Sequence, residues 1–344
     1  MSPDRYQQLL ARYQSLRLAV VGDFCLDRYL EIDPARGEVS IETSLPVHNV
    51  VNVRPQAGGA GTIVNNLSAL GLGSIHPLGF AGNDGEGFEL CEALGRQRGV
   101  QMDHFVRTPH RRTFTYCKPL IVSPGHPPRE LNRLDFKNWT ATPGTVEDRL
   151  IDGLRTLAAQ VDAVIVLDQV DVPETGVVTT RLLAALGELT NQGPNQWILA
   201  DSRRSLRGFP PVIFKMNAAE LGALAGAKQR LNLTEITSAA ATLAAKNGRL
   251  VFVTLSENGI LGAAPDGGVK HLPALPLRGA IDIVGAGDAV TANLAAALAA
   301  GATLEEALEI ANAAASVVIH KLGTTGTASP DEIKTLLFDS FRPA

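Results

Sequence analysis

The segment Ile281-Asp282-Ile283-Val284-Gly285-Ala286-Gly287-Asp288-Ala289 changes character at its two glycines. Apolar residues dominate before Gly285, and the alanine-rich stretch 289–300 predicts a helix. Gly285 and Gly287 can adopt backbone angles that other residues avoid, and they let a ligand approach the main chain closely. The free N–H groups and the dipole at the start of a helix favour an anion. The backbone of Gly285, Ala286 and Gly287 is therefore a candidate phosphate-binding turn.

Asp288 is the unexpected residue in this turn, because a bound anion repels a carboxylate. The arrangement makes chemical sense if Asp288 accepts a proton from a hydroxyl group that attacks phosphorus, as the catalytic-loop aspartate of protein kinases does. The alternative is that Asp288 only stabilises the first turn of the helix. The spacing of the turn alone favours this second interpretation, since glycine-rich turns before helices are common.

Composition narrows the class of protein. The 344 residues are 45% hydrophobic, which is enough for one large domain or a domain with an appendage. A net charge of −4 gives no signal for nucleic acid or membranes as partners. The N-terminus lacks the apolar core of a signal peptide, and the stretch 289–302 is too short to span a bilayer. Three widely spaced cysteines predict reduced thiols, so we expect a cytoplasmic protein.

The order of predicted elements indicates an α/β fold. Leu18–Gly22 reads as a buried strand, and from residue 145 onward predicted helices alternate with predicted strands. The helices are expected at 145–159, 174–191, 217–226, 234–247, 288–300 and 304–319, and the strands at 163–167, 197–200, 212–214 and 250–254, with hairpin-like strands at 259–264 and 268–272. Such alternation predicts a mostly parallel sheet with helices on both faces, a three-layer α/β/α fold.

Two segments interrupt this pattern and predict a small β-structure. Residues 31–55 contain short alternating runs with prolines, and residues 104–137 form a basic island in an acidic chain. Together, about 28–55 and 104–137 are expected to form a lid on a single domain that spans 1–344. Charges on a solvated sheet edge explain many of the basic residues. The alternative is that one or two arginines, such as Arg133, bind an anionic substrate.

Candidate ligand-binding residues follow the first strand. Asp23 and Asp27 come directly after Leu18–Gly22, and ligands of open α/β sheets bind beyond the carboxyl ends of strands. Both carboxylates are candidates to hold the hydroxyls of a polyol, although Asp23 alternatively serves only as a turn residue. Gly58-Gly59-Ala60-Gly61-Thr62 opens the next predicted helix. It is either a backbone-lined wall for a ligand or a site of tight helix packing.

Two further turns are candidate nucleotide and metal sites. Asn217-Ala218-Ala219-Glu220 follows an apolar strand and places an amide and a carboxylate on one helix face, where they are able to organise water around Mg²⁺. Taken alone, a helix N-cap with a capping glutamate explains this spacing better. The segment from Thr254 through Ser256 to Gly259 follows another predicted strand. It is either a binding site for nucleotide phosphates or an ordinary turn between two strands. P-loop, dinucleotide-binding, zinc-protease and serine-hydrolase motifs are absent from the sequence.

In this order, the segments resemble the ribokinase-like (PfkB) family of carbohydrate kinases from about Leu18 to about Pro330. Asp282–Asp288 is similar to the family's D-T-x-G-A-G-D signature, with Ile283 and Val284 at two departing positions. The resemblance implies Asp288 as the catalytic base and an anion hole from the backbone of 285–288. It also implies Mg²⁺ near Asn217 and Glu220, ATP near 254–259, and an adenine pocket closed by Asn312.

Within that family, the chain most resembles the heptose 7-phosphate kinases. Gly22–Tyr29 is similar to their G-D-x-x-L-D-R-Y, and Leu131–Phe136 is similar to their L-x-R-L-D-F. Two departures fall on the sugar side. Thr62 stands where the family has a substrate-contacting asparagine, and Asp171 stands where these kinases carry a lysine.

The resemblance implies ATP-dependent phosphorylation of a sugar or sugar-phosphate hydroxyl, most like a heptose 7-phosphate 1-kinase. Asp23, Asp27, Gly58, Gly59, Thr62 and Arg133 would hold the acceptor. The alternatives are a kinase of the same fold that acts on an unphosphorylated sugar or a nucleoside, and a non-catalytic regulator that binds a sugar or nucleotide. A homodimer through the lid is expected by family likeness.

Overall fold

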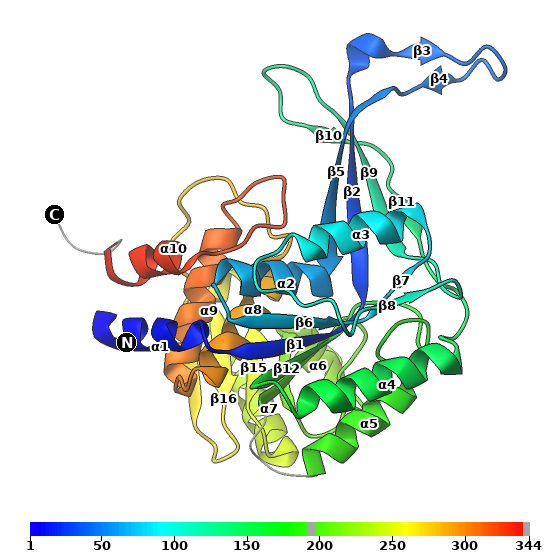
Figure 1. Ribbon diagram of the computed structural model, residues 1–344. Helices are drawn as coiled ribbons and strands as arrows, with labels where there is room; N and C mark the ends of the chain where they lie inside the picture. Colours follow the sequence, from blue (N-terminus) through cyan, green and yellow to red (C-terminus); the bar gives the residue numbers. More distant parts are fainter. Residues whose placement is uncertain (192–196, 340–344) are drawn as a thin grey trace.

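The computed structural model describes residues 1–191 and 197–339 and is built around an eight-stranded sheet with the order β17-β16-β15-β14-β13-β12-β1-β6 (Figure 1). Its strands are β1 (Arg17–Gly22), β6 (Ser74–Leu78), β12 (Ala163–Asp168), β13 (Trp197–Ser202), β14 (Ile213–Asn217), β15 (Val251–Thr254), β16 (Ile260–Ala263) and β17 (Val269–Leu272). Strands β6 through β15 in this order pair in parallel, and β16 and β17 add an antiparallel edge. The predicted mostly parallel sheet is confirmed.

Both faces of this sheet are buried, as alternation along β1 shows. Leu18 and Val20 pack into one hydrophobic core, and Ala19 and Val21 pack into a second core on the other face. The first core is covered by α1 (Pro3–Tyr13), α2 (Ala60–Ala69), α8 (Ala286–Ala299), α9 (Leu304–Val318) and α10 (Pro330–Lys334), and the second by α4 (Gly144–Ala158), α5 (Thr180–Asn191), α6 (Ala218–Leu224) and α7 (Leu233–Asn247). The three-layer prediction is therefore correct.

A second, five-stranded sheet projects from this body (Figure 1). It consists of β2 (Phe24–Ile32), β5 (Val50–Gly59), β9 (Phe114–Ile121), β10 (Arg129–Glu130) and β11 (Leu134–Phe136), and we call it the projecting sheet. The short strands β3 (Glu38–Val39) and β4 (Pro46–Val47) pair at its tip, and α3 (Gly85–Gly95) contacts its base.

The bounds of the projecting sheet differ from those expected for the lid. It begins at Phe24, only two residues after β1 ends, and β5 continues to Gly59. Strand β8 (Val106–Thr108) pairs with β7 (Phe80–Gly82) instead of joining this sheet. Its action as a lid, and the treatment of the whole chain as one domain, remain predictions.

Helix α5 begins later than its sequence pattern predicts, at Thr180 instead of residue 174. The intervening residues form a loop that folds over the end of β1, where the Val177 N–H donates to Asp23 Oδ1 at 2.6 Å. This tertiary contact overrides the helical pattern of 174–179. No helix within 1–191 or 197–339 has the length and apolar character needed to cross a membrane.

Candidate active site

The start of α8 adopts the turn that its glycines predict. Gly285 is the N-cap residue with a φ of 83°, a left-handed conformation that favours glycine. Ala286 N donates to Ile283 O at 3.2 Å, so that N–H has a partner within the turn. The N–H groups of Gly285, Gly287 and Asp288 remain the predicted anion donors.

Asp288 occupies the first turn of α8, and its side chain is partly buried. Burial first, and the nearby Asp201 carboxylate second, raise the pKa of Asp288 to about 7, while Lys215 and Arg203 oppose the rise. A general base is most effective when its pKa lies near the working pH. The structure thus gives Asp288 the electrostatics that a base needs, although the spacing alone favoured a helix-stabilising role.

A buried ion pair supports this turn from below. Lys215 Nζ on β14 contacts Asp201 Oδ2 on β13 at 2.7 Å, and Thr291 Oγ1 on α8 donates to the same oxygen at 3.0 Å. A Cβ atom on Gly287 would lie only 3.2 Å from Lys215 Nζ, which places the ammonium directly against the turn. Sequence reasoning missed both residues, although a lysine and an aspartate at the ends of buried strands were a usable signal.

Asn217 and Glu220 form a capping box at the start of α6. Asn217 Oδ1 accepts from Glu220 N at 2.9 Å, and Glu220 Oε2 accepts from Asn217 N at 2.8 Å. Asn232 and Glu235 make the same pair of bonds at the start of α7, so the N-x-x-E spacing by itself identifies only a cap.

The surroundings distinguish the two capping boxes. Glu220 lines a cavity of 270 Å³ together with Ser202, Arg203 and Arg204. Burial raises the pKa of Glu220, with Asp201 adding to the rise. Across 1–191 and 197–339, no group of three or more His, Cys, Asp or Glu side chains is arranged to hold a metal directly. An amide and a carboxylate that already accept backbone hydrogens fit Mg²⁺ only through water and nucleotide phosphates.

The remaining nucleotide-side candidates lie at one edge of the main sheet. Thr254 ends β15, and Ser256 starts a short 3₁₀ turn with a φ of 53°. Gly259 has a φ of 90°, and a Cβ there would collide with Leu272 O on β17, so glycine is required. Asn312 Nδ2 on α9 donates to Pro273 O at 2.8 Å. Contact of these residues with a nucleotide stays a prediction.

Asp23 is only 2% exposed and organises a loop. Its carboxylate accepts from Gln169 N at 2.8 Å, Val170 N at 3.2 Å and Val177 N at 2.6 Å. Burial and then Asp168 raise the pKa of Asp23 to about 6, against the effect of these bonds. The geometry favours the alternative in which Asp23 is a structural turn residue, and its contact with a sugar is an untested prediction.

Asp27 lies against Gly58 and Gly59, which we call the glycine wall. A Cβ atom on Gly58 would collide with Asp27 Oδ2, and a Cβ atom on Gly59 would stand 2.5 Å from Asp23 O. Gly59 also has a φ of 57°. These close approaches explain why glycine is required at both positions, even without a ligand. They also place Asp27 beside the glycine wall at the junction of the two sheets. Asp27 Oδ1 already pairs with Lys118 Nζ at 2.8 Å.

Thr62 and Arg133 are less available than expected. Thr62 is 1% exposed within the first turn of α2. Arg133 binds both oxygens of Asp135 at 2.7 and 2.8 Å and lies over the Tyr116 ring. Asp171, which replaces a lysine of similar kinases, pairs with Lys137 at 2.7 Å. Lys118, Arg133 and Lys137 of the basic island are thus each paired with a carboxylate.

Arg111, also in the basic island, is 5% exposed and donates to the carbonyls of Thr140, Ala141 and Thr175. It ties the chain together and is not directed to a substrate in this structure.

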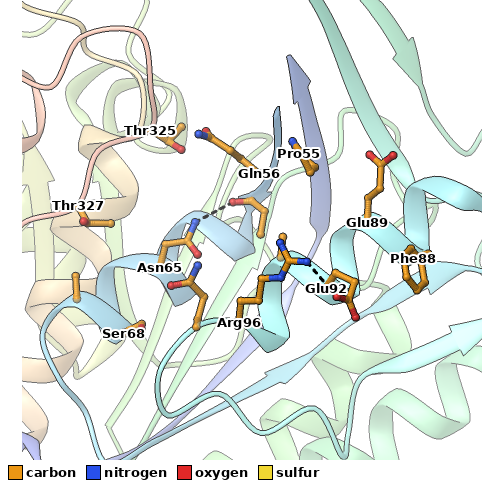
Figure 2. Close-up of a pocket in the computed structure, with 14 residues that line it drawn as sticks. Pro55, Gln56, Asn65, Ser68, Phe88, Glu89, Glu92, Arg96, Thr325 and Thr327 are labelled. Atoms are coloured by element: carbon orange, nitrogen blue, oxygen red, sulfur yellow. Dashed lines mark hydrogen bonds and ion pairs between the residues drawn. The ribbon is translucent and has the colours of Figure 1, made fainter. Parts of the chain in front are cut away.

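A larger cavity of 690 Å³ lies elsewhere, between β5, α2, α3 and the segment 325–327 (Figure 2). Figure 2 shows Asn65 bonded to Ala57 and Arg96 paired with Glu92 within its lining. None of the predicted site residues lines this cavity. The chemistry-bearing residues gather instead around the carboxyl ends of β1, β12, β13 and β14, which we call the candidate site.

Comparison with known proteins identifies the family of this chain. Residues 17–332 match the model of the pfkB family carbohydrate kinases. The bifunctional protein HldE of Bradyrhizobium sp. (strain ORS 278) is 30% identical over 99% of this chain and 67% of that protein. The HldE protein of Rhodospirillum rubrum is 31% identical over 94% of this chain and 63% of that protein. The chain therefore spans about two thirds of the length of these relatives.

Solved structures share the fold at low identity. Arabidopsis thaliana ribokinase complexed with ribose and ATP gives a TM-score of 0.66 at 21% identity and covers 94% of this chain and 99% of that one. Phosphofructokinase-2 from Escherichia coli in complex with potassium gives 0.69 at 18% identity, over 94% and 98% of the two chains. The family match extends over nearly the whole chain and includes the start of α8. The chain belongs to the PfkB family of carbohydrate kinases.

Proposed function

We propose that this carbohydrate kinase transfers the γ-phosphoryl group of ATP to a hydroxyl of a sugar phosphate, most like a heptose 7-phosphate 1-kinase. The observation that supports this reaction best is Asp288, with a pKa of about 7, at the start of α8 above the Lys215–Asp201 pair. A carboxylate poised as a base beside an anion-binding helix start suits phosphoryl transfer to an alcohol.

In the proposed mechanism, Asp288 takes the proton of the attacking hydroxyl as the bond to phosphorus forms. The N–H groups of Gly287 and Asp288 and the buried Lys215 ammonium stabilise the charge on the transferring group. Asp27, held by Lys118, and the glycine wall at Gly59 position the acceptor. The projecting sheet acts as the lid that excludes water, a competing acceptor.

Mg²⁺ would neutralise the phosphate oxygens of ATP in this reaction. Asn217 and Glu220 would hold it through water, because each already has one oxygen bonded to a backbone N–H. ATP itself would lie along Thr254, Ser256 and Gly259 toward Asn312, with the cytoplasm as the expected compartment.

The likeness to the heptose 7-phosphate kinases supports the acceptor class. The HldE relatives are called bifunctional, and this chain spans about two thirds of their length, so the proposal concerns one kinase reaction only. A kinase of an unphosphorylated sugar or nucleoside is the second candidate, because Lys118, Arg133 and Lys137 are each paired with a carboxylate.

A homodimer through the projecting sheet is part of the proposal. Val39, Ile41 and Leu45 near its tip are 63%, 100% and 63% exposed, and exposed apolar surface often marks an interface. Sedimentation velocity of the chain and of Ile41→Glu measures this directly. A monomer at micromolar concentration in both would contradict the dimer.

The deciding experiment measures ADP release from ATP and Mg²⁺ across free sugars, sugar phosphates, D-glycero-D-manno-heptose 7-phosphate and nucleosides, with Asp288→Asn as the blank. Turnover restricted to sugar phosphates supports the proposal. Turnover with a free sugar or nucleoside alone supports the second candidate. If no acceptor gives more ADP release with the wild type than with Asp288→Asn, catalysis is contradicted and a non-catalytic binding protein remains.

A further inference from the structure

Five positive charges around the candidate site are paired with carboxylates within the protein. The pairs are Lys118–Asp27, Arg133–Asp135, Lys137–Asp171, Arg204–Asp168 and Lys215–Asp201. A cation that is already paired with a carboxylate attracts an incoming anion less strongly than an unpaired cation does, because the carboxylate competes for its N–H groups. Lys118, Arg133 and Lys137 of the basic island are therefore poorly suited to recognise a phosphate on the acceptor.

Arg203 is the exception among the described residues of the candidate site. It directly follows β13, its side chain is exposed, and it forms no ion pair with any carboxylate in 1–191 or 197–339. In the amide orientation that satisfies both groups, the Gln169 oxygen accepts from Arg203 Nε at 3.0 Å and from Nη2 at 3.1 Å. A neutral amide thus holds one edge of the guanidinium, and no carboxylate of the described chain forms a direct ion pair with it.

Gln169 also fixes where this charge lies. Its Cγ atom is 3.6 Å from the position of a Cβ on Gly59, so the side chain packs against the glycine wall of the proposed acceptor pocket. Burial is the main cause of the raised pKa values of Asp288 and of Tyr116 on the projecting sheet, and the charge of Arg203 opposes both rises. Gln169 therefore holds Arg203 near the glycine wall, and the charge of Arg203 acts on both Asp288 and Tyr116.

We propose that Arg203, held in place by Gln169, binds the phosphate group that the acceptor already carries and so selects sugar phosphates over free sugars. This inference rests on the proposed kinase function. A guanidinium presents paired donors that match two phosphate oxygens, and a free charge makes these bonds strong. Asp171 would otherwise repel the phosphate, but Lys137 neutralises it at 2.7 Å.

We assign the transferring phosphoryl group to other partners. Lys215 lies against Gly287 at the start of α8 and is assigned to that group, whereas Gln169 holds Arg203 and itself packs against Gly59. Arg203 is thus assigned to acceptor recognition, with its effect expected in the KM of the acceptor and not in kcat.

The test compares Arg203→Gln and Arg203→Lys with the wild type on D-glycero-D-manno-heptose 7-phosphate and on the same heptose without phosphate. Loss of charge-assisted hydrogen bonds should raise the KM for the phosphorylated sugar about 10- to 100-fold with little change in kcat. The KM for the free sugar should stay within about twofold. Arg203→Lys should recover part of the loss, and Gln169→Leu should show a smaller effect of the same kind.

Arg207→Gln is the matched control, because Arg207 is an exposed arginine in the same loop without an ion pair in the described chain. Far-ultraviolet circular dichroism and melting of each variant establish that it is folded. An equal fall in kcat for both sugars would show that Arg203 acts on the transferring phosphoryl group and would overturn the proposal. Unchanged kinetics with the phosphorylated sugar would overturn it as well.

A binding measurement separates this inference from the kinase proposal. Isothermal titration without ATP should show tighter binding of heptose 7-phosphate than of heptose to the wild type, and Arg203→Gln should abolish the difference. This result supports the role of Arg203 even if no turnover is found. Equal affinities of the wild type for the two sugars, or binding of neither, would contradict it whatever the activity.

Discussion

The ion pair beneath the start of α8 and the Arg133–Asp135 pair of the projecting sheet differ in how deeply they are buried. Beneath α8, the Lys215 and Asp201 side chains are 7% and 12% exposed, and Thr291 bonds the same carboxylate oxygen. On the projecting sheet, the Arg133 and Asp135 side chains are 47% and 22% exposed. The first pair is buried within the fold, whereas the side chains of the second pair are accessible to water.

This difference in burial predicts how much each ion pair contributes to stability. A buried pair is costly to disrupt, because removal of one partner leaves an uncompensated charge, whereas an exposed pair contributes little. The proposed phosphoryl-transfer region is therefore preorganised by the fold, as electrostatic catalysis would require. The proposed acceptor region combines the buried Lys118–Asp27 pair, with side chains 13% and 9% exposed, and the weaker Arg133–Asp135 pair farther out.

The largest effect is expected from Asp288→Asn. Asparagine keeps the shape of the side chain but cannot accept the proton, so kcat should fall about 10²- to 10⁴-fold while ATP binding persists. Initial rates of ADP release and titration with ATP measure the two properties. Near-normal turnover would contradict the assignment of Asp288 as base.

Lys215→Met should cause the largest loss of stability. It leaves Asp201 buried without its cation, and we expect the free energy of unfolding to fall by about 3–5 kcal/mol. Equilibrium unfolding in urea measures this. The double variant Lys215→Met with Asp201→Asn is the control and should recover part of the loss. A change below about 1 kcal/mol would mean that the pair behaves like an exposed one.

The pH dependence of the reaction tests the electrostatics of the same region. Asp288 is active only when deprotonated, and its pKa of about 7 is raised by burial first. Activity should therefore be lost as the pH falls through about 7 and reach a plateau above it. A profile of kcat/KM between pH 5 and 9 checks this, and an acidic limb centred near the ordinary aspartate pKa of about 4 would contradict it.

The two capping boxes provide a matched pair of variants. Glu220→Gln and Glu235→Gln both keep a side-chain oxygen that can accept the N-cap N–H, and both remove the negative charge. Only Glu220 lines the 270 Å³ cavity beside Arg203, so only its replacement should raise the Mg²⁺ concentration for half-maximal activity, by about 10-fold. Identical Mg²⁺ titrations for the two variants would remove Glu220 from the metal site.

The smallest effect on stability is expected in the projecting sheet. Arg133→Gln breaks a half-exposed pair, and the free energy of unfolding should change by less than about 1 kcal/mol. Urea unfolding beside Lys215→Met makes the comparison direct. A loss as large as that of Lys215→Met would show that the projecting sheet is as rigidly organised as the start of α8.

The elements that the sequence predicted well depend on local rules. Alternation of strands and helices predicted the parallel sheet, and Gly285 and Gly287 predicted the turn that begins α8, because glycine conformations and burial patterns are encoded in short segments. The same logic failed at residues 174–179, where bonds to Asp23 replaced a helix with a loop. It also failed to separate Asn217–Glu220 from Asn232–Glu235, since the spacing in both is that of a cap.

By itself, the sequence determined the three-layer architecture, the position of Asp288 in its turn and the resemblance to carbohydrate kinases. Only the tertiary structure decided which charged side chains of the site pair with one another. The Lys215–Asp201 pair and the Gln169–Arg203 contact join residues on neighbouring parallel strands or the loops that follow them, separated by 14 and 34 positions in the chain. Such pairs depend on strand order and register, which bring the carboxyl ends of distant strands together and which no single segment of sequence specifies.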